Sequence, residues 1–151
     1  MPEITGTIAE NRRARFDYEV LEKIEAGIVL AGHEVKSAKL GKLNLAGSYG
    51  LVRGGEAYLF NASIQPFSGA NVPAGYEPDR NRVLLLEKSQ IRALEGKLKE
   101  PRFALIPLRA FVTRNLIKIE LGLARSKREA DKRETIRARD IDREMRRDLR
   151  K

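Results

Sequence analysis

The chain has 151 residues, and its 30 lysines and arginines outnumber 21 aspartates and glutamates for a formal net charge of +9. This length suits one domain with its own core, and the absence of cysteine excludes a disulfide framework and a thiolate metal site. No apolar run approaches the roughly 20 residues of a membrane span, and the N-terminal residues do not resemble a signal peptide, so we expect a cytoplasmic protein. The basic surplus favours a polyanionic partner, most often a nucleic acid, although a basic protein without such a partner remains the alternative.

The first thirty residues predict two strands separated by a basic segment. Residues 4–9 suit a short edge strand, and residues 11–15 hold three arginines that form either a solvated loop or a phosphate contact. From Phe16 to Leu30 apolar and charged residues alternate, which predicts a long, half-buried strand. Leu21 and Glu22 are out of phase, as at a β-bulge. Long, bent strands are typical of closed barrels.

A short basic helix follows this strand. The chain breaks at Gly32, and residues 33–40 predict a helix that Gly41 can end. Val35 and Ala38 lie three apart and share its buried face. We expect this helix to be a rigid mount for the cations of Lys36, Lys39 and Lys42.

The middle of the chain predicts further strands of a barrel. Gly54-Gly55 between two alternating segments indicates a hairpin of residues 48–53 and 56–61. Residues 65–82 show no period, as in a long loop that is functional or mobile. The remaining expected elements are an apolar segment at 83–86, a helix at 89–98 ended by Pro101, and strands at 103–112 and 116–123 joined by a turn at 113–115. We therefore predict a mainly β protein with five to seven strands, one short and one medium helix, and an oligonucleotide-binding type of barrel.

The composition changes near Ala124. Residues 125–151 contain twelve basic and seven acidic residues and too few apolar ones to form a core. Their helix propensity is good, so we expect a basic tail that is largely disordered when free and that becomes helical on a densely anionic partner. A coiled-coil arm or a solubilising tail is the alternative. We divide the chain into a barrel at 1–124 and a tail at 125–151.

The residues indicate binding rather than catalysis. The only histidine is His33, and the sequence has no nucleophile motif and no glycine-rich phosphate loop. We expect no enzyme activity, no cofactor and no metal. A metal nuclease built on Asp17, Glu19 and Glu25 is a remote alternative, because no partner constellation accompanies these carboxylates. A generic single-strand-binding barrel is another alternative, but such barrels use aromatic stacking and only 6% of this chain is aromatic.

Seven short motifs appear together and in order, and in combination the chain resembles the small protein B family, the SsrA-binding proteins of bacteria. The resemblance spans about residues 8–144. The motifs are NRRAR at 11–15, EAGIVL at 25–30, GHEVKS at 32–37, GK at 41–42, SY at 48–49, GEAYL at 55–59 and DKRE at 131–134.

The resemblance implies a non-enzymatic partner of transfer-messenger RNA in the rescue of stalled ribosomes. It implies that an oligonucleotide-binding barrel clamps the tRNA-like domain of that RNA at its elbow and stands in for the missing anticodon arm. It also implies that the tail becomes helical in the empty mRNA channel past the decoding site, and that elongation factor Tu delivers the complex. We expect a monomer.

The same resemblance implies where the contacts lie. The matching RNA-facing positions are Asn11, Glu25, Lys36, Lys42, Asn44, Arg80, Arg82 and Leu85, and the matching ribosome-facing tail positions are Lys127, Asp131, Lys132 and Arg133. The charge of their neighbours adds Arg12, Arg13, Arg15 and Lys39 to the first set and Arg128 to the second. The chain departs from the family with Ser126 where glycine is usual and Tyr76 where histidine is usual, which puts a freely bending joint at Ser126 in doubt.

Overall fold

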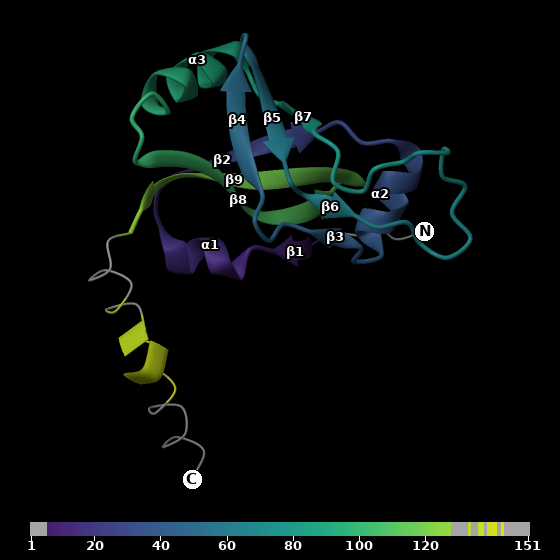
Figure 1. Cartoon of the computed structure of the whole chain (residues 1–151), viewed down its shortest axis with the longest axis horizontal. Helices are drawn as coiled ribbons and strands as arrows, with labels where there is room; N and C mark the ends of the chain where they lie inside the picture. Colours follow the sequence, from purple (N-terminus) through teal and green to yellow (C-terminus); the bar gives the residue numbers. More distant parts are fainter. Residues whose placement is uncertain (1–5, 128–132, 134–135, 138, 142, 144–151) are drawn as a thin grey trace.

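The computed structural model describes residues 6–127, 133, 136–137, 139–141 and 143 (Figure 1). Nine strands and three helices lie in the part of the chain from residue 6 to residue 127. In chain order they are β1 (Gly6–Glu10), α1 (Arg12–Asp17), β2 (Tyr18–Ile28), α2 (Gly32–Lys39), β3 (Leu43–Asn44), β4 (Tyr49–Arg53), β5 (Glu56–Phe60), β6 (Ser63–Ile64), β7 (Arg82–Leu85), α3 (Lys88–Lys97), β8 (Phe103–Thr113) and β9 (Leu116–Ser126).

The main sheet closes on itself. Its strand order is β1-β8-β4-β5-β7-β2-β9, and β8 also pairs with β9, so the six strands from β8 to β9 form a ring. The two expected hairpins are confirmed: Arg53 pairs with Glu56 and Thr113 pairs with Leu116. The closed barrel and the mainly β class are therefore as predicted, and β3 and β6 form a separate two-stranded ribbon.

The ring of strands has its shortest pairing between β4 and β8. These strands pair at one position, where Gly50 lies opposite Leu105. A Cβ on Gly50 would lie 2.7 Å from Leu105 Cδ2, so the absence of a side chain allows this close approach. Figure 1 shows α3 and α2 at opposite ends of the barrel, and α3 lies on the side of this seam, where its Glu95 lines a cavity together with residues of β4 and β8.

The barrel interior holds the apolar side chains that the alternation predicted. Ile119 and Leu121 of β9 and Leu59 of β5 are completely shielded from solvent. Each such buried side chain contributes about 1.5–3 kcal/mol to the free energy of unfolding. Val35 of α2 packs against the same core and Ala38 is buried in it, so the expected buried face of the basic helix is confirmed.

The N-terminal part of β2 differs from the prediction. Residues 12–17 form α1, so the strand begins at Tyr18 rather than at Phe16, whereas the expected bulge lies between Val20 and Glu22. The helix begins because the Asn11 side chain accepts a hydrogen bond from the Ala14 amide. The same side chain donates to the Pro107 carbonyl at 2.9 Å, a contact across 96 residues that the local pattern does not contain.

The end of β9 also lies beyond the expected boundary at Ala124. Tyr18 pairs with Ser126, and the Ser126 amide donates to the Arg102 carbonyl at 3.1 Å. Serine at this position therefore continues the strand instead of bending the chain. Further along, every described residue from 133 to 143 is helical. No helix in the described part of the chain has the length and apolar character to cross a membrane.

Candidate nucleic-acid interface

Helix α2 presents its lysines to solvent because its other face is anchored. Glu34, Ser37 and Ala38 are buried on the barrel side. Lys36 is exposed and its ammonium lies 4.9 Å from the centre of the Phe67 ring, while Lys39 is half-buried. Lys42 is exposed just after Gly41, which ends the helix with a φ of 83°. None of these three lysines forms an ion pair with another described residue, so their charges are available to an anion.

The buried carboxylate of Glu34 holds α2 and the long loop together. Arg82 donates to Glu34 Oε2 from Nη2 at 2.6 Å and from Nε at 3.1 Å. Arg80 also pairs with this carboxylate, through both Nε and Nη2. The Tyr76 hydroxyl has two possible acceptors for its hydrogen, Glu34 Oε2 at 2.9 Å and the Ile64 carbonyl at 3.0 Å. The loop at 65–81 therefore packs on α2 through specific polar contacts.

The charge of Glu34 is strongly favoured in this cluster. Burial would raise its pKa, but hydrogen bonds from Arg80, the Ala31 amide, Arg82 and Tyr76 outweigh burial and lower the pKa from 4.5 to about 2. Burial, and next the hydrogen bond to Glu34, raise the pKa of the Tyr76 hydroxyl. The position where the resemblance implies histidine thus carries a hydroxyl that stays neutral and serves this buried ion pair.

Two of the expected RNA-facing side chains are not exposed. The Arg82 side chain has no exposed surface, and it also donates to the carbonyls of Ala62, Pro78 and Arg80. Asn11 is only 5% exposed, since it caps α1 and binds the Pro107 carbonyl. In this structure both side chains hold neighbouring segments in place, and contact of these two positions with RNA stays a prediction.

The other expected contacts fall in three places. Asn44 of β3 is exposed beside Lys42, and its carboxamide oxygen accepts from the Ala46 amide at 2.9 Å. The Arg80 side chain is 37% exposed at the edge of the Glu34 cluster, so this group of residues shares the α2 face. Glu25 and Leu85 instead line a groove of about 610 Å³ between β2 and β7, where Glu25 lies 3.3 Å from the Lys118 ammonium.

The arginines of α1 form the third place. Arg12 and Arg13 are 91% and 80% exposed in their side chains, and each has a carboxylate partner, Glu10 at 3.8 Å and Asp17 at 3.4 Å. Arg15 is exposed, and its carbonyl accepts from the Lys127 ammonium at 3.1 Å. Arg133 is helical and exposed, whereas Arg128, Asp131 and Lys132 lie outside the described residues.

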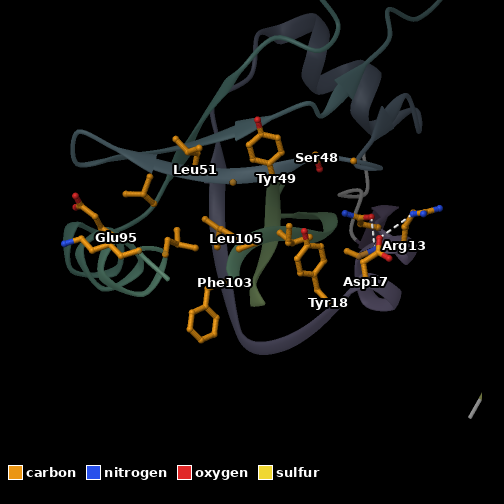
Figure 2. A pocket seen from close by; sticks show the side chains of 18 residues that line it. Arg13, Asp17, Tyr18, Ser48, Tyr49, Leu51, Glu95, Phe103 and Leu105 are labelled. Atoms are coloured by element: carbon orange, nitrogen blue, oxygen red, sulfur yellow. Dashed lines mark hydrogen bonds and ion pairs between the residues drawn. The ribbon is translucent and has the colours of Figure 1, made fainter. Parts of the chain in front are cut away.

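A mixed cavity of about 670 Å³ lies between α1, β4, α3 and β8. Figure 2 shows Tyr49 and Leu51 of β4 near Leu105 and Phe103 of β8, with Glu95 on the α3 side and the ion pair of Arg13 on the α1 side. Among the described residues no three histidine, aspartate or glutamate side chains group as metal ligands. Two carboxylates of the nuclease alternative form ion pairs, Glu19 with Arg125 and Glu25 with Lys118.

A closed β-barrel with lysines on an anchored helix, none of them in an ion pair within the described part of the chain, is typical of a nucleic-acid-binding module. A sequence model of the SmpB protein family matches residues 8–151. Curated proteins named SsrA-binding protein are similar to this chain over most of its length. Those of Symbiobacterium thermophilum and Chlorobaculum tepidum are each 49% identical, covering 95% and 92% of this chain and 90% and 88% of the relatives. The protein of Pseudomonas entomophila is 42% identical over 97% of this chain and 91% of the relative.

A solved structure agrees with these relatives. It is described as "tmRNA-SmpB: a journey to the center of the bacterial ribosome", and one of its chains matches with a TM-score of 0.68 and 42% identity. The match covers 89% of this chain and 96% of that chain. The chain therefore belongs to the SmpB family, a family of RNA-binding proteins rather than enzymes.

Proposed function

We propose that this protein binds SsrA, the transfer-messenger RNA, at its tRNA-like domain and acts with that RNA in the rescue of stalled ribosomes. The names of the curated relatives and the description of the similar structure support this function. The observation that carries it in this chain is the set of three lysines on and just after α2, which have no acidic partner among the described residues. Lysines in this state neutralise phosphates without first breaking an ion pair.

We assign the contacts to three groups of residues. Lys36, Lys39, Lys42, Asn44 and Arg80 form the α2 face, where the cations neutralise phosphates and Asn44 reaches sugar or base edges. Leu85 is 57% exposed beside Glu25, so it can pack on an unstacked base while the carboxylate accepts a hydrogen bond. Arg12, Arg13 and Arg15 form the third group, on α1.

The tail has a separate role in this proposal. We place its start after Ser126, where β9 ends, and we propose that it enters the mRNA channel of the small subunit and orders there. Its basic residues, with Lys127, Arg128, Lys132 and Arg133 at the front, suit ribosomal RNA, and Asp131 orients the two cations that follow it. We further propose a cytoplasmic monomer that reaches the ribosome with elongation factor Tu through the RNA complex.

A binding titration tests the RNA partner. The protein is titrated at physiological salt against the tRNA-like domain of transfer-messenger RNA, against an unrelated RNA hairpin and against poly-U. We expect clear preference for the tRNA-like domain and a salt slope that falls by about one in Lys36→Ala. Lys99→Ala, another exposed lysine located just after α3, is the matched control and leaves the preference unchanged. Equal affinity for all three RNAs would contradict the proposal, and tight binding to poly-U alone would favour the generic barrel.

A further inference from the structure

A second cleft lies between α1 and the tail, away from the α2 face. Its volume is about 530 Å³, and its walls are five arginines and one phenylalanine, namely Arg12, Arg13, Arg15, Phe16, Arg139 and Arg143. The tail contacts α1 through a cation–π interaction, in which the Arg139 guanidinium lies 5.5 Å from the centre of the Phe16 ring. Arg139 and Arg143 are helical and exposed, and they lie four residues apart on one face of that segment.

The positive charges of this cleft are not neutralised by acidic residues among the described residues that line it. Arg12 and Arg13 have the carboxylates of Glu10 and Asp17 nearby, but both arginine side chains remain at least 80% exposed. No acidic residue lines the cleft itself among the described residues. Like charges that converge on one cavity repel each other, so the approach of the tail to α1 is favoured most when an anion lies between them.

We infer that, before the tail enters the mRNA channel, α1 and the tail together form a second RNA-backbone site, in which a run of phosphates binds the arginines of both elements and fixes the tail against the barrel. Guanidinium groups suit this ligand because each donates two parallel hydrogen bonds to a phosphate. Phe16 holds the Arg139 side chain over its ring, so that arginine is positioned before the RNA arrives. The ligand class, RNA, rests on the proposed function, but the site is distinct from the α2 face.

Salt-dependent binding tests the site in the full-length protein with a short, blunt-ended RNA duplex of unrelated sequence. We expect Arg139→Gln and Arg12→Gln each to lower the salt slope by about one, so that the loss of affinity between roughly 50 and 200 mM salt becomes about 3.5-fold smaller. Arg137→Gln is the matched control, because Arg137 is helical and exposed but does not line the cleft. It should change the slope by less than half as much. Equal effects of Arg137→Gln and Arg139→Gln would overturn the inference.

A second measurement reads the geometry directly. The chain has no cysteine, so Asp140→Cys provides a unique position for a nitroxide label on the exposed tail segment. With the duplex bound, we expect the label to broaden the amide signals of residues 12–17 and to leave residues 53–56 unchanged; Arg139→Gln should reduce this broadening. Unchanged α1 signals in the bound state would overturn the site. Binding of Lys36→Ala to the tRNA-like domain, measured in parallel, reports on the proposed function alone.

Discussion

Glu34 is a residue whose environment in the fold differs from what its position in the sequence suggests. It lies on a lysine-bearing helix, where a glutamate is ordinarily solvated, yet its carboxylate has no exposed surface and pairs with Arg82 and Arg80. The buried Glu34–Arg82 pair does not face the RNA in our proposal, whereas Arg80 lies at its exposed edge. Its effect is to fix α2 relative to the loop at 65–81, which sets the direction in which the lysines point.

We predict that Glu34→Gln destabilises the protein by about 3 kcal/mol, because it leaves the buried Arg82 guanidinium without a counter-charge. Urea unfolding followed by circular dichroism measures the change. Glu95→Gln removes the same charge from an exposed position of α3 and should change the free energy of unfolding by less than about 0.5 kcal/mol. Equal stability of the two variants would show that the buried pair contributes nothing to the fold.

The same carboxylate predicts a dependence of stability on acid. The folded pKa of Glu34 is about 2, below its ordinary value of 4.5, so its contribution is complete above pH 4.5 and is lost as the pH falls toward 2. The difference corresponds to about 3 kcal/mol of unfolding free energy. As the pH falls through this range, the free energy of unfolding should decrease more steeply for the unchanged protein than for Glu34→Gln. Identical pH profiles would contradict the assignment.

At the scale of elements, the seam between β4 and β8 decides whether the barrel closes. Gly50 and Leu105 form its one paired position, and the space for a side chain there is already occupied by Leu105. Strand β4 therefore depends on a glycine that no turn requires. The cavity in Figure 2 lies along this seam, so a change in the seam alters the cavity as well.

We predict that Gly50→Ala lowers the free energy of unfolding by about 1–3 kcal/mol, since the new Cβ overpacks against Leu105. Gly96→Ala is the control within α3, where no atom lies within 4 Å of the added Cβ. That change should stabilise the protein by up to about 1 kcal/mol through helix propensity. Thermal unfolding shows whether each variant is less or more stable. An unchanged free energy of unfolding in Gly50→Ala would mean that the close approach of β4 and β8 does not stabilise the protein.

At the scale of the whole molecule, the sequence predicts what depends on local pattern. The glycine pair at 54–55 predicted one hairpin, and Pro101 predicted the end of α3. The spacing of Val35 and Ala38 predicted the buried face of α2. The membership of the family likewise follows from motifs that the sequence displays in order. These features require only neighbours within a few positions.

Long-range polar contacts were not predictable in the same way. Arg82 suggests an exposed cation until Glu34, 48 residues away, is known to be its buried partner. Asn11 is an ordinary polar residue until Pro107 is placed beside it, and without that contact α1 was interpreted as a loop. Both residues have partners that only the fold supplies, and the local sequence pattern does not indicate that their side chains are buried.

The division of the molecule into a selective barrel and a basic tail predicts the effect of truncation. A chain that ends at Lys127 keeps β9 intact and should retain its preference for the tRNA-like domain over an unrelated hairpin. It should lose rescue of stalled ribosomes, and its salt slope on unrelated duplex RNA should fall because the tail arginines are gone. Binding titrations and an in vitro translation assay with stalled ribosomes measure these effects. Loss of the preference would place selectivity in the tail.

The central claim is that the α2 face meets the tRNA-like domain, and tethered cleavage tests it most directly. An iron chelate attached at Leu40→Cys, an exposed position beside the lysines, should cut the bound tRNA-like domain at one cluster of nucleotides. The same chelate at Arg53→Cys, exposed at the β4–β5 turn beside α3, should cut it weakly or not at all. Cleavage from Arg53→Cys with none from Leu40→Cys would contradict the account.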